Sequence, residues 1–424
     1  MEKDEIRQIV IDQQHEFTQT QQKALAREQL PALKDLLTSS RLVKVVLGIR
    51  RSGKSTLCTQ ALRDKKALYL NFDDERLAGF DSEDLQRLLE VFKEMDPEAN
   101  VYFFDEIQNI ASWELFVNRL HRTGHNLLIS GSNGKLLSKE LATHLTGREV
   151  SLTLFPLSFS EFLAWRGIKL APGELQGLTS SRRAQLSGSF EDYFQRGGFP
   201  EVVLGEQPNI YLRELFDKII SRDIVQRHKI RDVRVIKEIA SYLIQNSSQF
   251  ISCQNIKTTF RLKSIVTTRK YVQLLQDVFL IHQIKGYSFK LKERSTSRRK
   301  TYSCDVGLIR ALWTKPTLDL GAQLETLVLL HLIKQGQEVY YLFEDAREVD
   351  FCTIEDGKPS QLIQVCYDLS SPKTKERELR ALVDLGKKYE AEDLFIVTRD
   401  LTENIVHDGK RIQIVPAWEF LLRT

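Results

Sequence analysis

One run of eight residues, 48–55, has the residue types and spacing needed to hold a phosphate group. It reads Gly-Ile-Arg-Arg-Ser-Gly-Lys-Ser and fits the pattern G-x-x-x-x-G-K-S/T. A largely apolar run at 42–47 precedes it and a helical pattern at 56–63 follows it, as the motif requires. The backbone N–H groups of such a loop and the positive end of the next helix point at an anion. Lys54 would reach the β- and γ-phosphates of a nucleotide, and the Ser55 hydroxyl would ligate Mg²⁺. The predicted nucleotide-binding residues are Gly48, Ile49, Arg50, Arg51, Ser52, Gly53, Lys54, Ser55 and Thr56.

A pair of acidic residues ends the apolar run at 101–104. Asp105 at the end of a strand could hold Mg²⁺, and the adjacent Glu106 could polarise the water that attacks the γ-phosphate. Taken alone, the pair could equally be an acidic helix N-terminus that complements the helix dipole. Because the phosphate loop is also present, we favour the catalytic interpretation, with Lys54 and Glu106 as catalytic residues.

Further polar residues could complete this site. Ser132 and Asn133 follow the run at 126–130, where they could contact the γ-phosphate or the attacking water, or simply form a turn. Arg148 could stabilise charge on the transferring phosphoryl group, from the same subunit or from a neighbour. The alternative for Arg148 is an ordinary surface arginine.

These residues need a scaffold, and the sequence predicts a parallel sheet. Apolar runs at 42–47, 67–72, 101–104, 126–130 and 149–154 are separated mostly by helical patterns. Such alternation is typical of an α/β fold with helices on both faces of the sheet. Functional residues then lie at the carboxyl ends of the strands, where the acidic and polar clusters fall.

The motifs also resemble a known family in their order along the chain. The relevant stretches are 48–55, 104–108, 130–133 and 145–162, followed by Gly-Gly-Phe-Pro-Glu at 197–201 and Ser-Arg-Asp-Ile at 221–224. Together they resemble the AAA+-type ATPases widespread in bacteria and archaea, whose C-terminal domain of unknown function has a restriction-endonuclease-like core. The resemblance spans nearly the whole chain. It implies ATP as the nucleotide, and it makes Arg148 a better candidate for an arginine finger.

Length and composition limit the classes of function. A chain of 424 residues holds two or three domains, and its net charge of +4 requires that any nucleic-acid surface be local. Five scattered cysteines without a C-x-x-C pair are typical of a reducing cytoplasm. A charged N-terminus and the lack of a long apolar run predict no signal peptide and no membrane span. We expect an ATPase domain at 1–165, a helical lid or linker at 166–231, a winged-helix region at 232–305 and a nuclease-like domain at 306–424.

The winged-helix expectation rests on three helical patterns between 232 and 285, then a strand and a wing at 290–300. Helix, helix-turn-helix and hairpin is the order of that fold, and the basic residues after 257 predict contacts with double-stranded DNA. The alternatives are a solvated charged face or a winged helix that contacts protein. The predicted DNA contacts are Lys257, Arg261, Lys263, Arg269, Lys270, Arg298, Arg299 and Lys300.

The C-terminal pattern resembles the PD-(D/E)xK nuclease core with an altered site. Glu325 would be the helix carboxylate and Asp350 the strand aspartate, but Gln364 and Cys366 stand where acid-x-Lys is expected. Glutamine lacks the charge that Mg²⁺ prefers, and cysteine cannot replace the lysine. Lys373 or Lys375 could stand in for that lysine. The pattern predicts an inactive scaffold.

The sequence therefore predicts a Mg²⁺-dependent ATPase that uses ATP to drive conformational change on DNA. Its expected partners are double-stranded DNA, further copies of itself in a homo-oligomer, and an unidentified protein. Three alternatives are an ATP-gated nuclease, a regulatory DNA-binding protein that uses ATP only as a switch, and an ATP-switched binder of protein partners without nucleic acid.

Overall fold

The computed structural model describes residues 1–20, 25–134, 147–171, 173–205, 207–290, 294 and 297–423. Leu145, Thr146 and much of the expected wing lie outside these residues. The chain forms two compact units, residues 1–155 with 277–279, and residues 156–276 with 280–424. The expected domain boundaries at 165, 231 and 305 stay predictions, and residues 277–279 of the expected winged-helix region lie with the first unit. No helix in the described residues is long and apolar enough to span a lipid bilayer.

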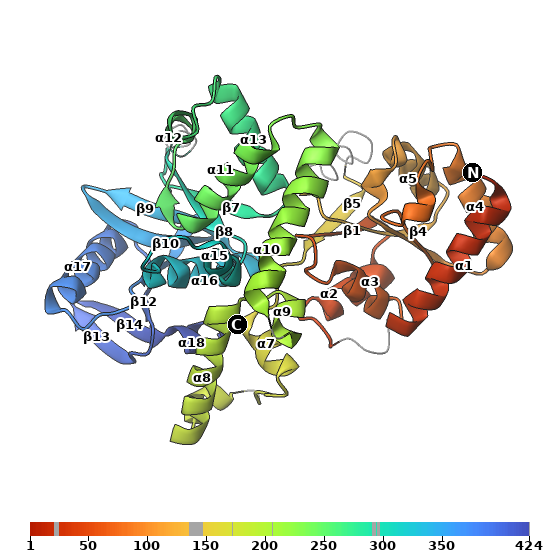
Figure 1. The fold of residues 1–424 in the computed structure, drawn as a ribbon. Helices are drawn as coiled ribbons and strands as arrows, with labels where there is room; N and C mark the ends of the chain where they lie inside the picture. The colour runs from red at the N-terminus through yellow and green to blue at the C-terminus, as the bar shows by residue number, and fades with distance from the viewer. Residues whose placement is uncertain are drawn as a thin grey trace. The chain divides into compact units, whose positions relative to one another are not determined.

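The first unit is built on a five-stranded sheet whose strands are all parallel (Figure 1). The strand order is β2-β3-β4-β1-β5, so β1 lies between β4 and β5. This confirms the predicted parallel sheet. The strands are β1 (Val43–Leu47), β2 (Ala67–Asn71), β3 (Val101–Asp105), β4 (Asn126–Gly131) and β5 (Glu149–Thr153).

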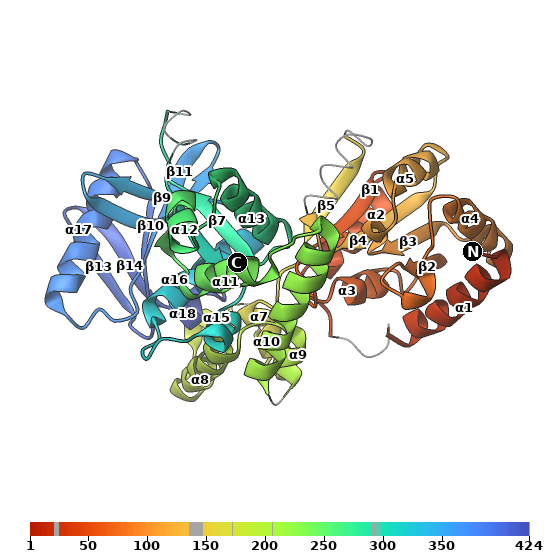
Figure 2. The same ribbon diagram turned by 45° about the horizontal axis from the view of Figure 1, so that its top comes forward.

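Helices cover both faces of this sheet because alternate residues of each buried strand point to opposite sides. Phe104 and Ile129 pack on one face with α4 and α5, whereas Phe103 and Leu128 pack on the other with α2 and α3. Helix α1 lies along β2 and beside α4 (Figure 2). The helices are α1 (Lys3–Thr20), α2 (Leu30–Ser39), α3 (Lys54–Ala61), α4 (Asp84–Met95) and α5 (Trp113–Arg122), with 3-10 turns η1 (Glu75–Leu77) and η2 (Ile107–Asn109).

The second unit opens with a set of helices. Helix α7 begins after Ser158, whose side chain accepts from the Glu161 backbone N–H while the Glu161 carboxylate accepts from the Ser158 N–H. This reciprocal pair of hydrogen bonds is a capping box. The elements are α7 (Phe159–Trp165), η3 (Glu174–Gly177), α8 (Ser180–Arg196), α9 (Pro200–Leu204), α10 (Pro208–Lys218) and the π-helix η4 (Ile219–Gln226).

A small three-stranded antiparallel sheet follows, in the order β6-β8-β7. Along the chain its elements run helix, strand, helix, helix, strand, strand. The stripe Ile236, Ile239, Leu243 on α11 is fully buried, as its 3.6-residue spacing predicts. The elements are α11 (Val233–Gln245), β6 (Gln249–Phe250), α12 (Cys253–Thr259), α13 (Ile265–Asp277), β7 (Ile281–Lys285) and β8 (Arg299–Ser303).

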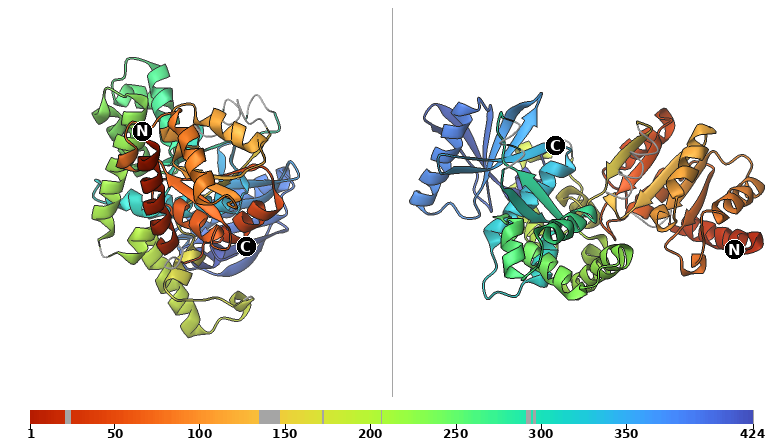
Figure 3. Two further views of the ribbon diagram at one scale, coloured as in Figure 1. Left: turned by 90° about the vertical axis from the view of Figure 1, so that its right-hand side faces the viewer. Right: turned by 90° about the horizontal axis from the view of Figure 1, so that it is seen from above.

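The chain ends in a six-stranded mixed sheet, drawn in blue in Figure 3, with the order β13-β14-β12-β11-β10-β9. Strands β9, β10 and β11 are antiparallel neighbours, whereas β12 is parallel to β11 after the crossover helix α17. The strands are β9 (Glu338–Glu344), β10 (Arg347–Glu355), β11 (Lys358–Val365), β12 (Asp393–Thr398), β13 (Glu403–His407) and β14 (Lys410–Pro416). The helices are α15 (Val306–Leu312), α16 (Leu320–Lys334), α17 (Pro372–Lys388) and α18 (Ala417–Phe420).

Candidate nucleotide site and a second charged cluster

The phosphate loop runs from the carboxyl end of β1 to the first turn of α3. Gly48 has φ +148°, and a Cβ there would lie 2.1 Å from the Leu154 carbonyl oxygen, so only glycine fits. Gly53 has φ +92° and directly precedes α3, which begins at Lys54. The loop therefore turns its backbone toward the start of a helix, which is the arrangement that binds a phosphate.

The lysine of the loop is held inside it. Lys54 is 5% exposed, and its amine donates to the Ile49 carbonyl at 3.1 Å. The same amine lies 3.9 Å from the Glu106 carboxylate. Ser55 and Thr56 follow in the first turn of α3, as predicted, and Arg50 forms an ion pair with Asp73 at 3.2 Å.

The acidic pair ends β3 at the same edge of the sheet. Asp105 is 2% exposed and accepts hydrogen bonds from the Ser130 hydroxyl and, at 3.4 Å, from the Tyr69 hydroxyl. Burial, with the neighbouring Asp105, raises the pKa of Tyr69. Asp105 is therefore a fixed carboxylate at the carboxyl end of the strand.

Glu106 adopts an unusual backbone conformation beside this aspartate. Its φ of +52° lies in the left-handed region, which costs free energy in a residue other than glycine. Its carboxylate accepts from the Ser132 hydroxyl at 3.1 Å, from the Ser132 N–H at 3.3 Å and from the Gln108 amide. The next residue, Asn133, is also buried. The residues following β3 and β4 therefore meet around the carboxylate that approaches Lys54.

Arg148 lies at the opposite edge of the sheet. Its carbonyl accepts from the N–H of Val43, which begins β1, whereas the phosphate loop follows the end of β1. Its exposed guanidinium approaches Asn118 at 3.5 Å. Because a full strand separates it from Gly48, Arg148 does not reach the phosphate loop of its own subunit in this structure.

One arginine that supports the loop lies outside the motifs recognised in the sequence. Arg27 is 4% exposed and donates to the Ser52 carbonyl at 2.6 Å and to the Phe155 carbonyl at 2.8 Å. It thereby ties the loop to the segment after β5. No local motif marks Arg27 as a residue that supports the loop. The same holds for Ser130 and Tyr69, because their contacts with Asp105 depend on the pairing of strands.

Most of the basic residues expected to contact DNA are exposed on the second unit. Lys257 on α12 is half-buried, whereas the side chains of the others reach solvent, and none of these seven forms an ion pair within the described residues. The charges of Arg269 and Arg299 both lower the pKa of the Cys253 thiol, which burial raises, so α13 and β8 meet near that thiol. The exposed residues are Arg261, Lys263, Arg269, Lys270, Arg298 and Arg299.

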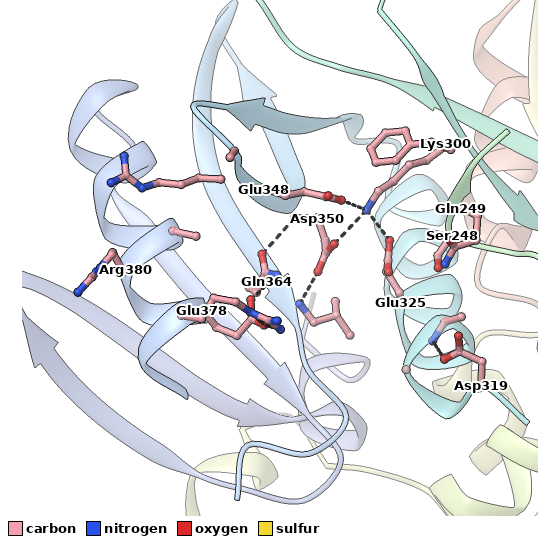
Figure 4. Close-up of a pocket in the computed structure, with 18 of the residues that line it drawn as sticks. Ser248, Gln249, Lys300, Asp319, Glu325, Glu348, Asp350, Gln364, Glu378 and Arg380 are labelled. Carbon is pink, nitrogen blue, oxygen red and sulfur yellow. Dashed lines mark hydrogen bonds and ion pairs between the residues drawn. The ribbon is translucent and has the colours of Figure 1, made fainter. Parts of the chain in front are cut away.

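Lys300 is a correction to this set. It is 3% exposed, and its amine lies 3.0 Å from Glu325, 3.0 Å from Asp350 and 2.5 Å from Glu348 (Figure 4). Burial lowers its pKa, but the three carboxylates raise it by more, so the amine stays charged. Lys300 therefore faces inward and cannot contact DNA. Side chains alternate along β8, which turns Arg299 outward and Lys300 inward.

The three carboxylates and Lys300 form one group, which we call the carboxylate–lysine cluster; Lys300, Asp350 and Glu325 are largely buried, and Glu348 is partly exposed. The Tyr302 hydroxyl donates to Glu325 at 2.7 Å, and the Val365 N–H donates to Asp350 at 3.0 Å. Burial and the neighbouring Asp350 raise the pKa of Glu325 to about 8, in spite of Lys300. A cavity of about 730 Å³ lies beside this cluster.

The altered positions of the predicted nuclease-like site are only partly brought together. Gln364 accepts from the Asp350 N–H at 3.2 Å and donates to the buried Glu378 at 2.8 Å (Figure 4). Cys366 follows the end of β11, and its thiol contacts the Asp368 carbonyl at 3.2 Å. Lys373 lines the cavity, but the lysine that contacts the acids is Lys300. Lys375 pairs with Glu403 instead.

Comparison with known proteins defines the class of the first unit. A family model described as an AAA domain matches residues 40–163, and one described as a domain of unknown function (DUF8612) matches residues 187–323. The first match contains the phosphate loop, the acidic pair and Arg148. The chain therefore carries an AAA-type P-loop ATPase domain, which binds nucleotide.

Two relatives extend the similarity along the chain. An uncharacterized protein of Methanocaldococcus jannaschii is 34% identical over 403 residues, which cover 90% of this chain and 88% of that protein. An uncharacterized protein of Haemophilus influenzae is 29% identical over 393 residues, covering 89% of this chain and 94% of its own length. The chain belongs to the family of the Methanocaldococcus protein.

One solved structure overlaps much of the fold. The Walker-type ATPase of Pyrococcus abyssi matches 67% of this chain and 94% of its own chain, at 13% identity and a TM-score of 0.42.

Proposed function

We propose that the protein is a Mg²⁺-dependent ATPase that uses hydrolysis to change its conformation on DNA. The observation that carries this proposal is the meeting of Lys54, Glu106 and Ser132 at the carboxyl edge of the sheet. Lys54 would neutralise charge on the phosphates, and Glu106 would orient and polarise the attacking water. Ser132 would hold the Glu106 carboxylate toward that water.

The residues fit a nucleotide with its metal ion. A side chain at Gly48 would fill the loop, and hydroxyl and carboxylate oxygens, the ligands that Mg²⁺ prefers, stand at Ser55 and Asp105. Within the described residues no group of three or more His, Cys, Asp or Glu side chains could hold a metal ion. Ser55 and Asp105 would therefore hold Mg²⁺ together with phosphate oxygens and water. Bound Mg²⁺ supplies positive charge at the transferring phosphoryl group.

Turnover by the full chain tests this proposal. Lys54→Ala should lower ATP turnover about 10²- to 10³-fold, because the loop loses its fixed positive charge. Lys66→Ala, on the exposed turn before β2, is the matched control and should keep wild-type turnover. EDTA should stop turnover, and Mg²⁺ should restore it. Unchanged turnover in Lys54→Ala would remove the site assignment.

A homo-oligomer would give Arg148 a route to phosphate. Because Arg148 lies at the edge opposite its own loop, it could reach only the nucleotide of a neighbouring subunit. Arg148→Ala and Lys54→Ala should each have low turnover, but mixing them should restore part of it, since some interfaces then pair an intact loop with an intact arginine. Failure of the mixture, with both variants folded, argues against a finger supplied in trans.

For the DNA partner we propose the surface that carries Arg269 and Arg299. The order and pairing of α11, β6, α12, α13, β7 and β8 are those expected of a winged helix, and these basic residues are exposed on it. Arg269→Ala with Lys270→Ala should weaken binding to a DNA duplex and reduce the salt slope by roughly 1–2. Arg234→Ala on α11 is the control. A protein with no measurable affinity for DNA would favour the protein-partner alternative.

The nuclease alternative has no specific observation in its favour. The acids that could hold a catalytic metal ion already surround the Lys300 amine, and the C-terminal sheet with its crossover helix therefore fits an inactive PD-(D/E)xK-like scaffold.

We place the protein in the cytoplasm, since all five cysteines are free thiols.

A further inference from the structure

A second cavity, of about 760 Å³, lies next to the carboxylate–lysine cluster in the second unit. Phe250 and Glu348 line both cavities, so the two share a wall. Its volume is within the usual range for ligand sites. Five aromatic rings line it together with polar and charged side chains, and these rings are Phe250, Tyr287, Tyr341, Phe343 and Tyr389.

The rings form a built surface rather than a chance gathering. Phe250 meets Tyr341 edge-on at 5.0 Å between centroids, and Tyr287 meets Tyr389 edge-on at 5.8 Å. Gly286 lets Tyr341 approach closely, since a Cβ at 286 would lie 3.0 Å from that ring. These contacts fix four ring planes around the cavity.

The fifth ring stands at the mouth of the cavity. Phe343 is 60% exposed and lies on β9, the edge strand of the six-stranded sheet. Phe289, which stacks on Tyr389 at 5.4 Å, is 66% exposed nearby. Two exposed phenylalanines beside an aromatic cavity leave apolar surface in water, which is a common sign of a binding site.

One positive charge at this cavity has no acidic partner. Arg298 lines the cavity and is exposed, and no acidic group pairs with it in the described part of the chain. Of the two acids in the lining, Glu344 pairs with Lys388, whereas Glu348 shares Lys300 with Glu325 and Asp350. The cavity thus offers aromatic rings and a guanidinium that could contact a phosphate.

We propose that this aromatic cavity binds an unpaired base of single-stranded DNA, with Arg298 on an adjacent phosphate. Bases stack on aromatic rings without regard to sequence, and arginine contacts the backbone. A paired base inside a duplex cannot enter such a cavity, so the site distinguishes single strands from duplexes. This inference rests on the proposed DNA-binding function and adds single-stranded DNA, bound at this cavity, to the duplex bound at the surface of Arg269 and Arg299.

The test measures the affinity of the full chain for a fluorescent twelve-nucleotide thymidine oligomer, by anisotropy. Phe343→Ala should weaken binding about tenfold, and Phe343→Tyr should restore it, because a ring returns. Since Phe343 is exposed, its removal should leave the protein folded. Val406→Ala, at another exposed apolar residue of the same unit, is the matched control and should bind as wild type does.

Two further probes separate base stacking from charge. An abasic oligomer of the same length keeps the phosphates but has no bases, so Phe343→Ala should not change its already weaker binding. A blunt duplex should also be unaffected by Phe343→Ala. Arg298→Ala should instead lower affinity for both single-stranded oligomers and flatten the salt dependence.

The possible failures are distinguishable. If Phe343→Ala binds the thymidine oligomer as wild type does, while Arg269→Ala with Lys270→Ala weakens duplex binding, the base site is wrong and the proposed DNA function stands. If no oligomer binds at all, both are wrong. If Phe343→Ala weakens binding of an acidic, tyrosine-containing peptide but not of the thymidine oligomer, the occupant is a protein segment and the proposal is overturned.

Discussion

Each unit of this protein has a buried lysine near carboxylate groups, but the two lysine amines differ in how many hydrogen-bond and ion-pair partners they have. In the first unit, Lys54 donates to one backbone carbonyl and lies 3.9 Å from Glu106. In the second, the Lys300 amine lies within 3.0 Å of Glu325, Glu348 and Asp350. Similar residue types therefore form two electrostatically different sites.

The difference shows what prepares a charged site for a ligand. An amine that three carboxylates surround has no donor left for a phosphate, and displacing it would leave buried charges without a partner. Lys54 gives up little when a phosphate arrives, and its loop contributes N–H groups that no strand uses. We infer that the first site serves chemistry and that the second holds β8 to α16 and β10.

The largest expected effect tests the second site. Lys300→Met should lower the free energy of unfolding of the second unit by about 3–5 kcal/mol, because Asp350 and Glu325, which are largely buried, lose the lysine that they share with the partly exposed Glu348. Urea denaturation measures the change. Arg299→Met, one residue away on the exposed side of β8, is the control and should change stability by no more than about 0.5 kcal/mol. A stable Lys300→Met protein would show that the cluster does not depend on its lysine.

The next effect tests the first site. Glu106→Gln should lower ATP turnover about 10²- to 10³-fold and leave nucleotide affinity within a few-fold of wild type, because the amide cannot polarise the attacking water. Single-turnover hydrolysis and nucleotide titration measure the two quantities. Glu114→Gln on α5 is the control and should behave as wild type. Loss of affinity equal to the loss of turnover would contradict the assigned role.

Acid should affect the second unit through two partly buried histidines, His282 and His331. Burial, with nearby Lys334, lowers the pKa of His282 and of His331 to about 4. Between pH 6.5 and 4 the unfolded chain therefore binds more protons than the folded one, so stability falls as pH falls through this window. For His331 alone the loss should be roughly 2–3 kcal/mol.

Comparison with His331→Gln isolates this contribution. The variant cannot take up that proton, so its unfolding free energy should fall less steeply than that of wild type between pH 6.5 and 4. Above pH 7 both proteins carry a neutral side chain and should differ by a constant only. The raised pKa of Glu325 has the opposite effect, because it lowers the free energy of unfolding as pH rises from about 4.5 to 8. This effect is the same in wild type and in His331→Gln, so it cancels in the comparison. Parallel curves throughout would rule out the histidine effect.

The sequence predicted the first sheet well because its signals are local. Buried parallel strands read as continuous apolar runs, and the phosphate loop is a contiguous motif. The rule that places Asp105 at the carboxyl edge of the sheet also places Arg148, which precedes β5, at the opposite edge. The position of Arg148 before β5 therefore predicts that Arg148 does not contact the nucleotide bound to its own subunit.

The second site was harder to predict, because it depends on contacts between distant segments. Because Lys300 follows Arg298 and Arg299, the sequence predicts that it belongs to an exposed basic wing. The alternation of side chains along β8 predicts the opposite, since Lys300 lies two residues before Tyr302 and therefore on the same, buried face of the strand. No spacing rule links Lys300 to Asp350, fifty positions later, and Arg27 beneath the phosphate loop is equally invisible without the fold.

The smallest effects give the sharpest form of the comparison, because one hydroxyl can be removed from each site. The Ser132 hydroxyl donates to Glu106 at 3.1 Å, and the Tyr302 hydroxyl donates to Glu325 at 2.7 Å. Ser132→Ala should lower turnover about tenfold, which is about 1.4 kcal/mol, and change stability by no more than about 0.5 kcal/mol. Tyr302→Phe should lower stability by about 1.5 kcal/mol, because a buried carboxylate loses a donor, and should leave turnover unchanged. The measurements are the ATP turnover rate and, from urea denaturation, the free energy of unfolding of each variant. If Tyr302→Phe lowers turnover as much as Ser132→Ala does, the carboxylate–lysine cluster takes part in the ATPase cycle and the division of roles is wrong.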